Sequence, residues 1–579
     1  ERPDREDTDM FGAKWFQGAE LNFAENLLRF RDQKKAIIFR NEQGEQRELT
    51  YIELYNAVTK CAAGLRKLGV QKGDRVAGYI SNTPEAIIAM LAVSSIGAIW
   101  SSTSPDFGSG GVLGRFGQIR PKVLFAVDGY RYNKQDFDRM ENIRKLSSEI
   151  PEIERIVIIP QLDGSHKLDE NMMLWDDLTD NDADSIEFEQ LPFDHPLYIM
   201  YSSGTTGTPK CIVHGQGGTL LQHFKELHLH TNLTRDDVIF FFTTCGWMMW
   251  NWLVSSLNIG ATIFLYEGSP FYPDPYNLWK AMEELKITIF GTSPKFLTAS
   301  EKTNTKPAEK HDLSTLDTIL STGAPLTKEN FNYVYEKIKS DVQLSSISGG
   351  TDIVSCFMLG NPTLPVFSEE IQCRGLGMAV EAYDQKGEPK LEEKGELVCT
   401  KPFVSMPVYF WNDPEGVKYW EAYFDHFPGI WTHGDYIKVT RNGGVIVYGS
   451  SDATLNPGGV RIGTAEIYRI VEAMDEIQDS IVVGQKWKGD TRVMLFVVMK
   501  EGRELTDNLK IAIKKAIKAG LTPRHVPDKI HGIDQVPMTL NGKKVELAVT
   551  NVLNGEDVTN RAALANPEAL EQFEKYRAG

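Results

Sequence analysis

The sequence has few cysteines and fewer basic than acidic residues, and each shortage argues against a class of protein. Its six cysteines are widely scattered and form no CxxC or zinc-type spacing, so a reduced, cytoplasmic compartment is expected. The net charge is −17, from 62 Lys and Arg against 79 Asp and Glu. Because nucleic acid binding requires a basic face for the phosphates, we expect no nucleic acid partner.

The sequence also lacks a long uninterrupted apolar run. The longest, Ala86–Trp100, contains Ser94, Ser95 and Gly97 and is too short to span a membrane. It predicts a buried helix, and we expect no membrane association. The first nine residues are polar and acidic, unlike a signal peptide, although the chain does not begin with Met and a removed signal stays open.

The length of 579 residues exceeds that of one ordinary core and predicts at least two domains. From residue 36 to about 320, strand-like apolar runs alternate with helical patterns, which predicts an α/β fold with parallel sheets and helix crossovers. The predicted helix 50–68 carries a capping box from Thr50 and Glu53. From about residue 371 the strands are short and separated by Gly turns, which predicts an antiparallel, β-barrel-like part.

A change of pattern near residue 450 predicts the domain boundary. Residues 449–459 are small and polar with Gly and Pro, as hinges are, and a compact α+β pattern follows. We therefore expect a large domain over residues 1–451 and a small mobile domain over 452–579, with a terminal helix over 562–576.

The segment Tyr201–Lys210 contains glycines and hydroxyl residues and ends in a lysine, between two apolar strands. Glycines let the backbone approach a ligand closely, and successive N–H groups in such a loop bind anions. A nucleotide P-loop is excluded, because Pro209 stands where its second glycine should be and Cys211 follows the lysine. A polyphosphate is the expected guest, while an ordinary surface loop stays open on composition alone.

In this order the residues resemble the phosphate-binding loop of the adenylate-forming enzymes, which include acyl-CoA synthetases, luciferases and peptide-synthetase adenylation domains. The resemblance implies that Mg²⁺ and ATP are cofactors and that an acid is activated as its acyl-AMP. It assigns to ATP the residues Ser202, Ser203, Gly204, Thr205, Thr206, Gly207 and Lys210.

Further motifs occur in the order found in that superfamily. The resemblance implies that the turn after the predicted strand 318–320 lies along the adenine and the acyl group, while an ordinary strand-ending turn stays open on the residues alone; it contains Gly323, Ala324 and Pro325. The segment 346–352 ends in Thr351, for a phosphate, and Asp352, for Mg²⁺. The family has Glu at this last position, and the shorter Asp allows a bridging water instead of direct coordination.

The motif 431–435 supplies Asp435, whose carboxylate would accept both ribose hydroxyls. Ser450 departs from the family, which has a nucleotide-binding Arg there, and this leaves the nucleotide affinity open. Arg461 matches the Gly-x-Arg of the family and is assigned to ATP.

The resemblance also implies a moving lysine. Lys543 follows an Asn-Gly turn and matches the catalytic lysine that bridges the acid and the α-phosphate, whereas Lys544 is expected to be an ordinary solvated lysine. Asp452 matches the hinge about which the small domain turns, and this rotation would bring Gly459 to the CoA tunnel.

Two features indicate the acid and the acceptor. Only about 35 residues follow Lys543, which leaves no room for a carrier domain, so free CoA is expected. Acetyl-CoA synthetases close the acyl pocket with a Trp where Gly349 stands here, beside Gly350, so a longer acid could enter. The opposite wall, with a polar amide for a second oxygen, is assigned to Trp247, Met248 and Asn251.

Nearly the whole chain resembles the acetoacetyl-CoA synthetase branch, which implies acetoacetate, ATP and CoA as partners, with a monomer as the working expectation. Arg131 and Lys134 are candidates for the CoA 3′-phosphate, with a solvated loop as the alternative. The alternatives left open are another short acid (acetate, propionate or 3-hydroxybutyrate), a non-catalytic adenylate- or acyl-CoA-binding homologue, and a luciferase-like oxygenase.

Overall fold

The computed structural model describes residues 10–162, 166–202, 209–451, 455, 463–487, 490–521, 523–539, 542–558, 561 and 564–577. One large sheet has eight strands in the order β10-β9-β6-β4-β5-β12-β13-β25 and is parallel from β10 to β12. Their bounds are β4 Arg75–Tyr79, β5 Ile99–Thr103, β6 Val123–Val127, β9 Arg155–Ile159, β10 Met172–Leu174, β12 Pro196–Ser202, β13 Lys210–Gly215 and β25 Tyr409–Phe410.

The second large sheet has seven strands in the order β18-β17-β16-β14-β15-β2-β3, all parallel except the last pair. Their bounds are β2 Lys35–Asn41, β3 Gln46–Thr50, β14 Val238–Phe241, β15 Thr262–Glu267, β16 Ile289–Thr292, β17 Thr318–Ser321 and β18 Gln343–Ser346. The predicted parallel sheets with helix crossovers are confirmed.

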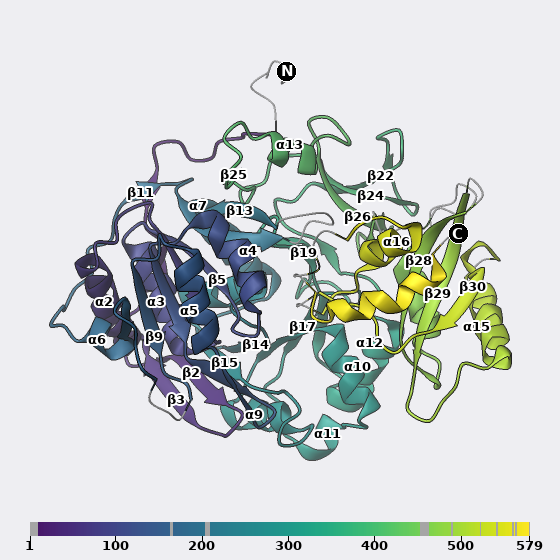
Figure 1. Ribbon diagram of the computed structural model, residues 1–579, viewed down its shortest axis with the longest axis horizontal. Coiled ribbons are helices and arrows are strands. Elements are labelled where there is room, and N and C mark those ends of the chain that lie inside the picture. The colour runs from purple at the N-terminus through teal and green to yellow at the C-terminus, as the bar shows by residue number, and fades with distance from the viewer. Residues whose placement is uncertain are drawn as a thin grey trace.

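Helices lie between the two sheets and on their outer faces (Figure 1). Ile37 faces a core shared with α3 and the first sheet, whereas its neighbour Ile38 faces the outer core with α9, as strand alternation requires. The helices of this part are α1 Phe23–Leu27, α2 Tyr51–Lys67, α3 Pro84–Ser95, α4 Ser109–Ile119, α5 Met140–Glu149, α6 Trp175–Thr179, α7 Gln216–Lys225, α8 Met248–Val254, α9 Asn277–Leu285, α10 Pro294–Lys302, α11 Pro307–Lys310, α12 Lys328–Tyr333 and α13 Val417–Tyr423.

Two local predictions in this part had different outcomes. The capping box of α2 is confirmed, since Thr50 accepts from the Glu53 N–H and Glu53 accepts from the Thr50 N–H. The prediction of one helix over the apolar run 86–100 is wrong at its end. Gly97 adopts φ 80°, which ends the helical segment, and Trp100 lies on strand β5.

Short antiparallel strands follow, as predicted. A three-stranded sheet and a five-stranded sheet in the order β23-β22-β24-β26-β27 form this part. The strands are β19 Ser348–Gly350, β20 Ser355–Leu359, β21 Cys373–Arg374, β22 Val380–Tyr383, β23 Pro389–Lys390, β24 Lys394–Cys399, β26 Trp431–Val439 and β27 Val445–Ser450. The order of the five-stranded sheet runs between two edges and does not close into a barrel.

The C-terminal part has its own sheet, β28-β29-β30, with helices on both faces (Figure 1). Its elements are α14 Thr464–Val471, β28 Ile477–Trp487, β29 Asp490–Met499, α15 Asp507–Gly520, β30 Lys529–Gly532 and α16 Glu546–Asn554. The terminal element is a 3-10 helix, η7 Pro567–Tyr576, shorter than the helix predicted from 562. Pro567 lacks an N–H and keeps Asn566 out of the helical region, which places the start there.

Candidate functional site

A β-hairpin frames the predicted phosphate loop. Strands β12 and β13 pair antiparallel, and Ser202 lies opposite Lys210 at the last register position. This confirms the predicted strand–loop–strand frame. Five residues assigned to ATP lie outside the described residues, namely Ser203, Gly204, Thr205, Thr206 and Gly207.

At the mouth of this hairpin, Lys210 meets the carboxylate predicted to bind Mg²⁺. The Lys210 Nζ lies 3.6 Å from an Asp352 oxygen and 5.0 Å from the centre of the Tyr423 ring. The Tyr423 hydroxyl donates to Asp352, and its ring stacks on Trp431 at 3.8 Å. Burial by itself would raise the pKa of Asp352, but Lys210, His433 and Tyr423 lower it below its ordinary value, so the carboxyl is ionised.

Two buried histidines hold the turn that carries Thr351 and Asp352. The His214 Nε2 lies 2.8 Å from the Thr351 carbonyl oxygen, and the His223 Nε2 lies 2.6 Å from that of Val354. Burial lowers the pKa of each imidazole to about 4, so both are neutral and donate through Nε2. Val354 has φ 50°, a strained conformation for a β-branched residue, so the turn depends on these partners.

The second predicted motif lies at the carboxyl edge of the seven-stranded sheet, beside the acyl-pocket segment. Gly323 has φ 96°, and a Cβ there would lie 3.7 Å from the Trp247 ring. Ala324 and Pro325 continue the same turn after β17. The Thr322 hydroxyl donates to the Ile347 carbonyl and ties this turn to the segment before β19. Residues 25 positions apart therefore meet at the edge where parallel sheets bind ligands.

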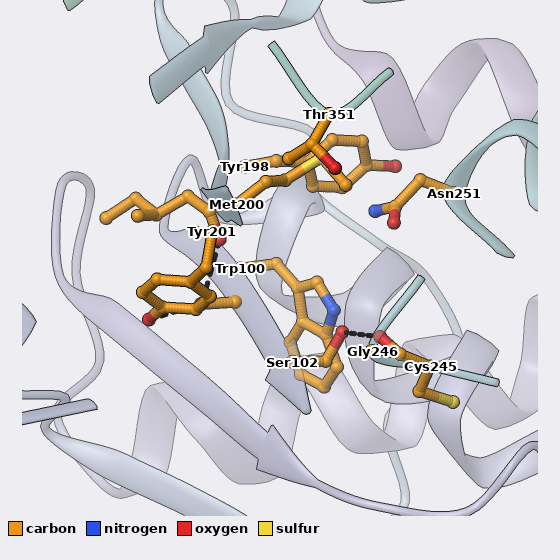
Figure 2. Close-up of a pocket in the computed structure, with 11 residues that line it drawn as sticks. Trp100, Ser102, Tyr198, Met200, Tyr201, Cys245, Gly246, Asn251 and Thr351 are labelled. Carbon is orange, nitrogen blue, oxygen red and sulfur yellow. Dashed lines mark hydrogen bonds between the residues drawn. The ribbon is translucent and has the colours of Figure 1, made fainter. Parts of the chain in front are cut away.

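A pocket opens between strands β5 and β12 and the segment before α8 (Figure 2). Of the predicted acyl-pocket residues, Asn251 lines it, and Thr351 lies at one end. Trp247, Met248, Gly349 and Gly350 do not line this pocket. The lining is completed by Trp100, Ser101, Ser102, Tyr198, Ile199, Met200, Tyr201, Cys245 and Gly246. Trp100, Ser101 and Ser102 were not predicted from the sequence, where the available signal was a polar pair after an apolar run.

The expected role of Gly349 as an opening in the acyl pocket is not supported by its surroundings. A Cβ at Gly349 would lie 2.0 Å from the Ser355 carbonyl oxygen and 2.5 Å from the Cys356 Cα, so its free side faces the backbone of β20. A Cβ at Gly350 would meet nothing closer than Asp352 at 3.8 Å. Close strand contact explains the first glycine, and the second has open space beside Asp352.

The predicted ribose residue lies on the five-stranded sheet. Asp435 on β26 pairs in register with Ser450 on β27, and the His433 Nε2 lies 3.8 Å from its carboxylate. The Ser450 hydroxyl donates to the Gly434 carbonyl at 3.1 Å. Ser450 therefore supports the backbone beside Asp435. The hinge residue Asp452, and Gly459 and Arg461 after it, lie outside the described residues.

The adjacent lysines of the C-terminal part have opposite environments. Lys543 is exposed, its backbone N–H donates to the Thr539 hydroxyl, and no described residue forms an ion pair with its Nζ. Lys544 is half-buried and forms ion pairs with Glu472 and with Asp479, 2.8 Å from the latter, so the expectation of a solvated lysine is wrong. A Cβ at Gly542 would lie 3.7 Å from the Lys295 Nζ, which places this turn beside the start of α10.

Arg131 and Lys134 lie on a small hairpin, β7 Gly129–Tyr132 and β8 Gln135–Asp138. Arg131 pairs with Asp136, and the Lys134 Nζ lies 5.2 Å from the Tyr272 ring centre. The buried Glu42 carboxylate accepts from the Lys134 N–H at 2.8 Å, which fixes the hairpin turn. Lys134 therefore lies on a backbone that is held in place, and Arg131 already has a carboxylate partner.

Among the described residues, no three His, Cys, Asp or Glu side chains gather to hold a metal ion. Asp352 is a single carboxylate beside the Lys210 ammonium group at the end of the hairpin. No described helix has the length and apolar character needed to cross a membrane.

Comparison with known proteins agrees with this geometry. Residues 23–410 match the AMP-binding enzyme family, and residues 466–543 match the AMP-binding enzyme C-terminal domain. The chain is 52% identical to an acetoacetyl-coenzyme A synthetase of Rhizobium meliloti (strain 1021), over 97% of this chain and 87% of that one. It is 50% identical to an acetoacetyl-CoA synthetase of Gallus gallus, over 97% of this chain and 86% of that one.

A solved structure of an acetoacetyl-CoA synthetase from Streptomyces lividans superposes with a TM-score of 0.94 at 43% identity, covering 98% of this chain and 88% of that one. The predicted α/β architecture, with a large N-terminal and a smaller C-terminal part, is thereby confirmed. The chain belongs to the AMP-binding enzyme family and, within it, to the acetoacetyl-CoA synthetases.

Proposed function

We propose that this protein joins acetoacetate to CoA in two steps. The acetoacetate carboxylate attacks the α-phosphorus of ATP, and pyrophosphate leaves with formation of acetoacetyl-AMP. The CoA thiolate sulfur then attacks the acyl carbonyl, and AMP leaves with the bonding electrons of the broken acyl–oxygen bond. Identity of 50–52% to acetoacetyl-CoA synthetases over 97% of the chain supports this reaction.

The observation that carries the proposal is the ion pair of Asp352 and Lys210 beside Thr351, which lines a pocket that also holds the Asn251 amide. The first step brings two anions together, so its rate depends on charge neutralisation and positioning. Lys210 would neutralise phosphate oxygens, and Asp352, 3.6 Å away, would hold Mg²⁺, which supplies further neutralisation when bound. The neutral His214 and His223 keep the Asp352 turn in place without adding charge.

The remaining predicted residues would bind the nucleotide, supply the catalytic lysine and form the hinge. Gly323, Ala324 and Pro325 would border the adenine, and Asp435 would accept the ribose hydroxyls. Lys543 would bridge the acid and the α-phosphate in the first step. Its exposed Nζ and its turn beside α10 suit an approach to the edge where β16 and β17 end. Asp452 would be the hinge between residues 1–451 and 452–579, and rotation there would withdraw Lys543 before the thiol enters.

The test is thioester formation with a panel of acids at equal concentration, in the presence of ATP, Mg²⁺ and CoA. Acetoacetate should give the highest kcat/KM, ahead of acetate, propionate, butyrate and 3-hydroxybutyrate, with one AMP released for each thioester. A preference for acetate or propionate would replace the substrate but keep the reaction class. The absence of ATP consumption with every acid would favour a non-catalytic binding protein.

A further inference from the structure

The pocket in Figure 2 contains an indole N–H that has no acceptor. Trp100 is 1% exposed, and its Nε1 forms no hydrogen bond with any described residue. In Figure 2 this nitrogen points toward the space bounded by Asn251 and Gly246. A buried donor without an acceptor costs free energy, which a ligand atom in that space would recover.

The neighbouring hydroxyls do not supply the missing acceptor. The Ser102 hydroxyl donates to the Cys245 carbonyl at 2.7 Å, and the Ser101 hydroxyl lies 2.8 Å from the Ile199 carbonyl. Asn251 is 3% exposed and its carboxamide carries two N–H groups, one of which serves the hydrogen bond with the Tyr198 hydroxyl. The pocket therefore presents donors from two elements, an indole on β5 and an amide on α8.

Thr351 lies at another part of the same pocket wall, next to the Asp352–Lys210 pair where the carboxylate would be activated. An acid bound with its carboxyl group at Thr351 extends its chain toward Trp100 and Asn251. An acceptor oxygen on that chain would satisfy the indole N–H, whereas a methylene would leave it unpaired.

We propose that Trp100, together with Asn251, recognises the 3-oxo oxygen of the acyl chain and so selects β-keto acids over alkanoic acids of equal length. The inference rests on the proposed function, since it names the group by which that same site chooses its acid. A carbonyl oxygen only accepts and offers two lone pairs, which matches donors on two sides. A 3-hydroxyl group also accepts, so 3-hydroxybutyrate should rank between acetoacetate and butyrate.

The test compares kcat/KM for acetoacetate and butyrate in the wild type and in Trp100→Phe. The substitution keeps an aromatic ring and removes the N–H donor. The ratio of kcat/KM for acetoacetate to that for butyrate should therefore fall about tenfold, which corresponds to the loss of one net hydrogen bond. Trp279→Phe is the matched control. Its indole is also buried and without a described acceptor, but it lies in the outer core beside Phe290, away from the pocket. That variant should keep the wild-type ratio.

Several outcomes decide the matter. An unchanged ratio in Trp100→Phe overturns the inference, and so does an equal loss for both acids with a raised KM for CoA, which would assign the indole to the CoA arm. If Trp100→Phe does not fold, Asn251→Leu replaces it with the same expected fall and the same refutation. A wild type that forms no acetoacetyl-CoA refutes the proposed function itself, a result distinct from failure of either variant.

Discussion

Replacing Gly349 by Ala should destabilise the protein, because the new methyl group has no space. The added Cβ would lie 2.0 Å from the Ser355 carbonyl oxygen and 2.5 Å from the Cys356 Cα, whereas real contacts of this kind stay above 3.0 Å. Strands β19 and β20 must separate by about 1 Å at a pairing distance of about 4.8 Å. Overpacking of about 1–3 kcal/mol and a weakened ladder bond of about 1 kcal/mol give a loss of about 2–4 kcal/mol.

Gly350→Ala is the matched control, because its Cβ would meet nothing within 3.8 Å. Both variants lower the conformational entropy of the unfolded chain by the same amount, so this contribution cancels when their free energies of unfolding are compared. The assay is denaturant unfolding followed by fluorescence, with the midpoints compared. Gly349→Ala should unfold at clearly lower denaturant, and Gly350→Ala should stay within about 0.5 kcal/mol of the wild type, as surface changes do. Equal denaturation midpoints for the two variants would refute the conclusion that a side chain at position 349 would run into the backbone of β20.

Three further outcomes are expected. Lys210→Met should raise the pKa of Asp352, so the acid limb of the kcat/KM profile should move to higher pH; an unmoved limb would mean that Lys210 does not set this pKa. Lys544→Met should lower the unfolding free energy by on the order of 3 kcal/mol, because two partly buried carboxylates lose their partner, and an unchanged calorimetric melt would contradict this. Burial raises the pKa of Glu267 from 4.5 to about 7, so the free energy of unfolding falls as pH rises between these two values. In Glu267→Gln the free energy of unfolding should fall less steeply with pH over this range. The same slope in the variant and the wild type would contradict the raised pKa.

Local patterns predicted much of the fold. The alternation of strands and helices from residue 36 to about 320 forms two sheets with parallel strands, and the capping box at Thr50 forms as predicted. Such features depend on side chains a few positions apart, so the sequence alone contains the information. The phosphate-loop frame was predictable for the same reason, since two apolar runs flank Tyr201–Lys210 and pair as a hairpin.

Features set by distant partners were not predictable. A register shift between Ser348 and Gly349 in their pairing with β20 turns the free side of Gly349 toward backbone. Nothing in the motif indicates that shift, because it depends on how the strand is paired. Lys543 and Lys544 are adjacent, and the burial of one is set by Glu472, 72 positions away.

The missed side of the pocket has a similar cause. Trp100 was assigned to the end of an apolar helical run, and the turn at Gly97 places it on β5, opposite Tyr198 of β12. Its role depends on the fact that Asn251, on helix α8 and 151 positions later in the sequence, lines the same space. Periodicity could identify Trp100 as buried but could not identify the pocket that it faces.

The measurement that tests the account most directly is exchange of labelled pyrophosphate into ATP without CoA, for the wild type and for Lys543→Ala. We expect exchange that requires acetoacetate in the wild type and is lost in the variant, while both proteins convert supplied acetoacetyl-AMP and CoA to thioester. Exchange that needs no acid, or an equal loss of both half-reactions in Lys543→Ala, would contradict a two-step reaction whose first step alone uses this lysine.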